Sequence, residues 1–244
     1  MLYFIVPLRS RKSSNNWAKV VSDFNMTLKS ILSQQDPNFK VIVACTDIPE
    51  HPADERIEII VVELEERHTK GTGMDKWNKI HAMCIRIREL GGGFIMPVDA
   101  DDLVSNKVSR LVNESGGQVG YYANTGYEYD EKAKRITFAP KFYNLCGTCA
   151  VMYCPVEDLP QSIKDYDNKK YPVLATHTFF KGLFEERNTP LKPFPFKAAI
   201  YKINTGENRS ILTNNIGFKR KIIRLIYRGS RVSAKIREEF SLYD

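Results

Sequence analysis

The stretch Phe94-Ile-Met-Pro-Val-Asp-Ala-Asp-Asp102 decides the fold class of this chain. Its first five residues form an apolar run that follows three consecutive glycines, which is the pattern of a buried strand. The run ends in three carboxylates, those of Asp99, Asp101 and Asp102. Aspartate is rarely buried without a partner, and clustered like charges repel one another. A hard divalent cation would explain the cluster, because Mg²⁺ and Mn²⁺ take oxygen ligands and share them with substrate phosphates.

Strand and helix candidates alternate along the first half of the chain. Apolar stripes at helical spacing predict a helix that follows the cap residues Asn15 and Asn16, and a second helix over residues 75–90. Short apolar runs predict strands at residues 2–6, 39–45, 56–62 and 94–98. This alternation favours an α/β fold with a mostly parallel sheet.

The acidic cluster falls where such a sheet binds its ligands, since the crevice lies outside the carboxyl ends of the strands. The alternative interpretation is that Asp101 or Asp102 caps a helix that begins near Asn106. In the second half, residues 120–124 and 135–138 are predicted as antiparallel strands that flank a turn at residues 127–131. Six prolines follow and predict a loop-rich region: Pro155, Pro160, Pro172, Pro190, Pro193 and Pro195.

Length and composition are those of a soluble globular protein. The chain has 244 residues, of which 43% are hydrophobic and 27% are charged. No apolar stretch approaches the roughly 20 residues that a membrane span needs. The apolar run at residues 1–6 is too short for the core of a signal peptide, and basic residues follow it instead of preceding it. We therefore expect a cytoplasmic protein.

Five scattered cysteines do not indicate a disulfide framework. Cys146 and Cys149 have CxxC spacing, but one such pair lacks the four ligands of a structural zinc site. We expect a structural role for this pair, with redox chemistry or metal binding as the alternative.

The excess of basic charge lies at the C-terminus. Residues 218–244 contain eight basic and three acidic residues, which gives them +5 of the formal net charge of +7. Apolar residues at fourfold spacing predict two short helices there, separated at Gly229-Ser230. The extension could lie on an anionic membrane at its inner face. Alternatively, its apolar side could cover the main domain. We expect no nucleic-acid partner, because no binding motif of that kind is present.

The order of motifs resembles the GT-A glycosyltransferases, most closely family 2. That family opens with a strand that ends in proline, a helix that ends in Ser-Ile-Leu-x-Gln, and another strand, which correspond here to residues 4–7, 30–34 and 41–45. Its metal motif, Asp-x-Asp-Asp after an apolar strand, corresponds to residues 99–102. Its small-residue strand at the acceptor loop corresponds to residues 147–153.

The resemblance covers about residues 1–215 and implies a GT-A (Rossmann-like) fold, with a mostly parallel central sheet flanked by helices. It implies a domain over residues 1–217, with a nucleotide-sugar half (1–112) and a loop-rich acceptor half (113–217) that share one sheet. A basic helical extension follows at residues 218–244.

The implied activity is that of a hexosyltransferase in polysaccharide or glycoconjugate synthesis. The sugar would pass, with inversion, from a UDP- or GDP-sugar to a hydroxyl of a saccharide or lipid-linked acceptor. The implied cofactor is Mn²⁺ or Mg²⁺, which would offset the charge on the departing diphosphate. Asp99 and Asp101 are the expected ligands, and Asp102 would support them. The expected nucleotide-sugar-binding residues are Pro7, Leu8, Arg9, Asp47, Lys76, Asp99, Ala100 and Arg209.

His177 lies where the resembling family has its catalytic carboxylate. It could act as the general base, since imidazole titrates near neutral pH. It could instead be a third metal ligand or a structural residue. Glu185 and Glu186 are the alternative bases, on a helix predicted to begin at Phe179.

Other functions share features of this sequence. A phosphatase of the haloacid-dehalogenase type needs Thr or Val two residues after its second Asp, where this chain has Leu103. An EF-hand loop needs Gly and Glu where this chain has Val104 and Arg110. A sugar-phosphate nucleotidyltransferase would need a glycine-rich loop after the first strand, where residues 8–14 contain no glycine. It stays an alternative, as does a non-catalytic nucleotide-sugar-binding module that has lost its base.

Overall fold

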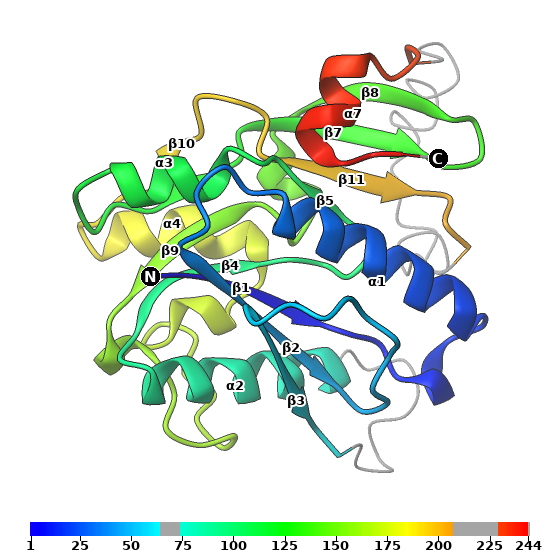
Figure 1. The fold of residues 1–244 in the computed structure, drawn as a ribbon. Helices are drawn as coiled ribbons and strands as arrows, with labels where there is room; N and C mark the ends of the chain where they lie inside the picture. Colours follow the sequence, from blue (N-terminus) through cyan, green and yellow to red (C-terminus); the bar gives the residue numbers. More distant parts are fainter. Residues whose placement is uncertain (64–73, 207–228, 244) are drawn as a thin grey trace.

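The computed structural model describes residues 1–63, 74–206 and 229–243 (Figure 1). Within these residues, a seven-stranded sheet has the strand order β10-β6-β9-β4-β1-β2-β3, and a four-stranded sheet has the order β5-β11-β7-β8. Most neighbours in the larger sheet are parallel. The predicted α/β class with a mostly parallel central sheet is confirmed.

Four parallel strands form the part of the larger sheet that comes from the first half of the chain: β1 (Leu2–Pro7), β2 (Phe39–Cys45), β3 (Ile57–Val61) and β4 (Gly93–Pro97). Each lies within one residue of its predicted bounds. β1 is central, with β4 on one side and β2 on the other. Its apolar residues form a continuous run, because a parallel strand inside the sheet is covered on both faces.

The other strands of the larger sheet come from the second half of the chain: β6 (Tyr121–Tyr122), β9 (Ala150–Cys154) and β10 (Lys192–Pro193). β9 pairs antiparallel with β4 and with β6. The strand predicted at residues 120–124 is therefore shorter and has another partner. It ends early because the carbonyls of Ala123 and Asn124 accept hydrogen bonds from the short 3₁₀ helix at Phe142–Asn144.

The smaller sheet consists of β5 (Leu103–Val104), β7 (Thr125–Asp130), β8 (Arg135–Pro140) and β11 (Ala199–Ile203). The prediction that both halves share one sheet holds for the larger sheet, to which each half contributes strands, and the smaller sheet was not predicted. The turn predicted at residues 127–131 is wrong, because most of that stretch is β7. Tyr129 lies opposite Ile136 on β8 and both are buried, so the tyrosines serve as cross-strand partners. The turn follows at residues 131–134.

Two long helices lie on opposite sides of β1 and β2 (Figure 1). α1 (Trp17–Leu32) begins after Asn16, whose side chain accepts a hydrogen bond from the backbone N–H of Lys19 at 3.1 Å, so the predicted cap is confirmed. α2 (Met74–Glu89) packs on β1 and β2. The shorter helices are α3 (Val108–Glu114), α4 (Phe180–Glu186) and α7 (Ala234–Phe240).

The described part of the C-terminal extension packs on the smaller sheet (Figure 1). Val232, Phe240 and Leu242 are buried in one apolar cluster with residues of β5, β7, β8 and β11. Glu239 accepts hydrogen bonds from Ser105 Oγ at 2.7 Å and Lys107 Nζ at 2.8 Å. This part of the extension therefore covers the main domain, as the alternative interpretation expected. The first predicted helix of the extension lies outside the described residues. Among the described residues, no helix is long and apolar enough to span a membrane.

Replacement of Phe240 tests this role of the extension. Its side chain is 1% exposed and its ring contacts that of Tyr127, with centroids 6.2 Å apart. We expect Phe240→Ala to lower the free energy of unfolding by roughly 3–5 kcal/mol, because it leaves a cavity in the cluster. Chemical denaturation would measure this loss. The exposed neighbour Lys235→Ala should have little effect, and equal stability of both variants would show that the extension is not part of the core.

Candidate functional site

The acidic loop at residues 99–102 connects the two sheets. Before it, the backbone N–H of Val98 donates to the carbonyl of Ile5 on β1 at 2.9 Å, and after it the chain enters β5. The N–H of Asp102 donates to the carbonyl of Asp99 at 3.0 Å and closes the turn. The loop therefore lies at the carboxyl ends of β4 and β1, as predicted.

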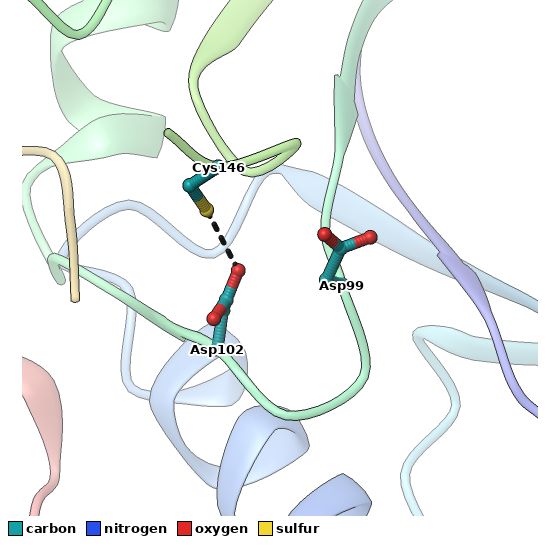
Figure 2. A group of neighbouring side chains, drawn as sticks. All are labelled: Asp99, Asp102 and Cys146. Atoms are coloured by element: carbon teal, nitrogen blue, oxygen red, sulfur yellow. Dashed lines mark hydrogen bonds between the residues drawn. The ribbon is translucent and has the colours of Figure 1, made fainter. Parts of the chain in front are cut away.

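Asp102 is a buried anchor (Figure 2). One carboxylate oxygen accepts hydrogen bonds from Cys146 Sγ at 2.8 Å and Thr148 Oγ1 at 2.6 Å, and the other accepts from the backbone N–H of Lys202 at 3.3 Å. Burial, together with the charges of Asp101 and Asp99, raises the pKa of Asp102 well above its usual range. Asp102 thus joins the acidic loop to the loop before β9 and to β11.

The interpretation of Asp101 or Asp102 as a helix cap is wrong. α3 begins only at Val108, and its N-cap residue is Lys107, which makes no side-chain capping hydrogen bond. The acidic residues are therefore not required to begin this helix.

Asp99 lies between α2 and the loop that precedes β9. Its carboxylate forms an ion pair with Lys76. Its backbone N–H donates to Thr148 Oγ1 at 2.9 Å. A Cβ added at Gly147 would lie 2.9 Å from the carboxylate, so only glycine fits there without displacing Asp99. Burial alone would raise the pKa of Asp99, but Lys76 and His177 outweigh it and hold the pKa below its usual range.

Asp101 is only partly exposed, and it lies close to two other carboxylates. Burial raises the pKa of Asp101 to about 6, and the charges of Asp99 and Asp23 act in the same direction. The positive charges of Lys202 and Lys76 oppose that shift. The loop therefore holds more negative charge than its surroundings easily accommodate.

A buried ion network lies beside Asp101. Lys202 Nζ on β11 lies 2.5 Å from Asp23 on α1, and Lys19 Nζ lies 2.6 Å from the same oxygen. Both lysines also approach Glu131, at 3.5 and 2.8 Å. The side chains of Lys202 and Asp23 are 1% and 3% exposed. A buried charge is tolerated only when it is paired, and this network supplies both signs.

Buried polar residues on α1 and directly after it hold the chain that follows the acidic loop. Thr27 Oγ1 donates to the carbonyl of Asp102 at 2.8 Å, and Ser30 Oγ accepts from the N–H of Val104 at 3.1 Å. Gln34 Nε2 donates to the carbonyl of Ser105, before α3, and its Oε1 accepts from the N–H of Ser109, within α3, each at 2.8 Å. The serine and glutamine of the Ser-Ile-Leu-x-Gln phrase are therefore positioning residues for the loop.

His177 begins a 3₁₀ turn that leads into α4, and its ring lies near Asp99. Burial lowers the pKa of His177; the charge of Asp99 opposes this shift and that of Lys76 adds to it. A hydrogen bond to the backbone of Asn144 favours the protonated ring, so the imidazole is the donor and the carbonyl the acceptor. The predicted proximity of His177 to the acidic loop agrees with this arrangement, while its role stays a prediction.

The alternative bases lie on α4. Glu185 is exposed and forms an ion pair with Lys181 at 3.4 Å within the same helix. Glu186 is exposed as well. Both stay predictions as catalytic groups.

The residues predicted to bind the nucleotide base and ribose follow β1. Pro7 and Arg9 are half-buried. Leu8 is fully buried, and its carbonyl accepts a hydrogen bond from Lys79 Nζ at 2.8 Å. Lys79 also pairs with Asp75 at 2.8 Å and is itself buried, so this lysine fixes the end of β1 to the start of α2. It was not predicted from the sequence.

Three other predicted binding residues occupy separate places. Asp47, after β2, accepts a hydrogen bond from the backbone N–H of Arg11 at 2.8 Å. Ala100 is half-buried and packs against the main core. Arg209 lies outside the described residues. No feature of the structure tests the contact of these residues with a nucleotide.

A possible ligand set for a metal combines Asp99, Asp102 and Cys146, whose ligand atoms lie within 4.8 Å of one another (Figure 2). The predicted set was Asp99, Asp101 and His177. Burial and the adjacent carboxylates raise the pKa of the Cys146 thiol well above its usual range, so it stays protonated. A hard cation prefers oxygen ligands, and cysteine binds metals as the thiolate. Cys146 is therefore better explained as a hydrogen-bond donor to Asp102 than as a metal ligand.

The cysteines of the described chain are free and buried. Burial raises the pKa of Cys149 as it does that of Cys146. Reactive cysteines have a lowered pKa and some exposure, and these two have neither. The structural interpretation of the CxxC pair is therefore favoured.

Comparison of the sequence with known protein families and with curated proteins gives no match. Among solved structures, the chain is similar to S. aureus TarS, with 12% sequence identity and a TM-score of 0.43. The similarity covers 83% of this chain and 36% of that chain, so this chain spans about a third of the length of the TarS structure.

Proposed function

We propose that this protein is a glycosyltransferase that moves a sugar from a nucleotide-diphosphate sugar to an acceptor hydroxyl with Mn²⁺ or Mg²⁺. The observation that supports it is the convergence of Asp99, Asp101, Lys76 and His177 at the carboxyl end of β4. Open α/β sheets bind their ligands at this position. The proposed donor is a UDP- or GDP-sugar, and the proposed acceptor is a saccharide or lipid-linked saccharide in polysaccharide or glycoconjugate synthesis.

The residues fit a divalent cation. Asp99 and Asp101 supply carboxylate oxygens, the ligands that Mg²⁺ and Mn²⁺ prefer. The raised pKa of Asp101 reflects crowded negative charge that a cation would relieve. The ammonium group of Lys76 already lies against Asp99, so the position beside this carboxylate accommodates positive charge. When bound, the ion would offset the charge on the diphosphate leaving group.

Lys76 would contact the diphosphate of the donor, and His177 would act on the acceptor hydroxyl. The side chain of Lys76 is 46% exposed, and its ion pair with Asp99 keeps it protonated, so it can donate to diphosphate oxygens. His177 donates one ring N–H to the carbonyl of Asn144, which leaves the other ring nitrogen with its lone pair. That nitrogen would accept the proton of the acceptor hydroxyl as the hydroxyl oxygen attacks the sugar. Attack opposite the departing diphosphate would invert the anomeric centre.

The pKa of Asp101 predicts how metal binding depends on pH. The carboxyl group must lose its proton to bind a cation, so we expect Mn²⁺ affinity to fall by about tenfold for each pH unit below about 6. In the absence of metal, the stability of the protein depends on pH with the opposite sign. Because the folded pKa is raised above 3.8, this group contributes stability at low pH that is lost as the pH rises through about 6. Calorimetric titration with Mn²⁺ from pH 5 to 8 would measure the dependence. A flat affinity would show that Asp101 does not bind the ion.

A thermal-shift screen tests the proposed function directly. UDP and GDP would be added to the intact protein with Mn²⁺, with Mg²⁺ or with EDTA. We expect one nucleotide to raise the melting temperature only when a metal is present, because a ligand that binds the folded state stabilises it. The absence of any metal-dependent shift for either nucleotide would contradict the proposal.

A further inference from the structure

Two tyrosines and a lysine form a polar patch next to His177. The rings of Tyr122 and Tyr143 meet edge to face, with centroids 5.5 Å apart and an interplanar angle of 83°. Lys181 Nζ lies 5.8 Å from the centre of the Tyr122 ring and also interacts electrostatically with Tyr143. Glu185 pairs with this lysine at 3.4 Å. We call these four residues the tyrosine–lysine patch.

The backbone fixes both tyrosines. Tyr122 is on β6, and its carbonyl accepts a hydrogen bond from the N–H of Phe194 at 3.0 Å. Tyr143 is in the 3₁₀ helix before β9, and its N–H donates to the carbonyl of Ala123 at 3.0 Å. Because both residues are half-buried and their main chains are held, the two rings are ordered before any ligand binds.

The patch continues the site at the acidic loop. His177 is hydrogen-bonded to Asn144, the residue after Tyr143. His177 lies in the 3₁₀ turn that leads into α4, and Lys181 and Glu185, four residues apart, lie on one face of that helix. The patch therefore adjoins His177.

We infer that the tyrosine–lysine patch is an acceptor subsite that binds the hydroxyl groups of a neutral saccharide next to His177. This inference rests on the proposed function, because it assigns the acceptor side of the same site. Two phenols, an ammonium and a carboxylate offer both hydrogen-bond donors and acceptors, which a sugar hydroxyl needs, since it acts as both. The ammonium of Lys181 is already balanced by Glu185, so the patch favours a neutral saccharide over an acidic one.

Saturation-transfer NMR with defined sugars tests the inference. The probes are the neutral disaccharides cellobiose and lactose, the acidic sugar glucuronic acid, and the open-chain polyol sorbitol. We expect at least one neutral disaccharide to bind, and to bind more tightly than glucuronic acid or sorbitol. Tyr122→Phe, Tyr143→Phe and Lys181→Ala should each weaken that binding by about two- to tenfold, the usual contribution of one hydrogen bond. The phenylalanine variants keep both rings, so the fold should be retained.

The exposed Lys164→Ala is the matched control and should bind the disaccharide as the parent does. Metal-dependent stabilisation by UDP or GDP, measured on the same samples, separates this inference from the proposed function. If a nucleotide binds but no neutral disaccharide does, or if the patch variants bind it unchanged, the inference is wrong and the proposed function stands. Tighter binding of glucuronic acid would also overturn the assignment of a neutral ligand. If neither nucleotide binds, the proposed function is wrong, and the inference that rests on it is wrong as well.

Discussion

Asp101→Asn is expected to abolish the Mn²⁺-dependent stabilisation of this protein by nucleoside diphosphates while the fold stays intact. The amide has nearly the shape of the carboxylate but no charge, and divalent cations prefer charged oxygen ligands. The raised pKa of Asp101 indicates that its ionisation costs stability in the absence of metal, so the neutral amide should not destabilise the protein. Thermal shift with UDP or GDP, with Mn²⁺ or EDTA, would measure both effects.

Two further variants make this result specific. Glu114→Gln removes an exposed carboxylate at the end of α3 and should leave the metal-dependent shift unchanged. Asp102→Ala should instead lower stability with or without metal, because it leaves the buried donors of Cys146 and Thr148 without an acceptor. A full metal-dependent shift in Asp101→Asn would remove Asp101 from the metal site.

His177→Ala is expected to lower sugar transfer by about 10²–10⁴-fold, the usual contribution of a general base. Donor affinity should stay within a few-fold, because the imidazole would act on the acceptor hydroxyl and not on the nucleotide. Steady-state kinetics with the best donor, together with calorimetric titration of the nucleotide, would separate the two quantities.

Each other role of His177 predicts a different pattern. A metal ligand would give weaker Mn²⁺ affinity and partial rescue at high metal concentration. A structural residue would give lower thermal stability without a specific kinetic defect. His51→Ala, in the loop after β2, is the matched control and should transfer at the parent rate. Transfer at the parent rate in His177→Ala would make Glu185 or Glu186 the next candidate base.

The parallel part of the fold could be predicted because local signals and tertiary structure agree there. The apolar run before Asp99 is a buried strand, and a buried parallel strand has no polar face to obscure its pattern. The N-cap at Asn16 could be predicted because capping depends on neighbouring residues alone. The proximity of the acidic loop to the ends of β1 and β4 follows from the rule that parallel strands share their carboxyl edge.

The buried ion network beside Asp101 could not be predicted, because the burial of its charges depends on segments that are distant in the sequence. Lysine is almost never buried without a partner, yet Lys202 on β11 is buried and pairs with Asp23 on α1. The polar spacing of Asp23, Thr27 and Ser30 on α1 was the available signal, since it repeats at helical intervals beside the apolar stripe. The sequence predicted that the extension could cover the main domain, but not that α7 packs on the smaller sheet, because that contact joins the C-terminal end of the sequence to its middle.

Cleavage of a nucleotide sugar is the most direct test of the central claim. The intact protein would be incubated with UDP- and GDP-sugars, with Mn²⁺ or with EDTA, and the release of UDP or GDP would be measured with and without a saccharide acceptor. We predict metal-dependent release that an acceptor accelerates and that Asp101→Asn eliminates. Metal-dependent binding of the donor without any release would contradict the account and identify a non-catalytic binding module instead.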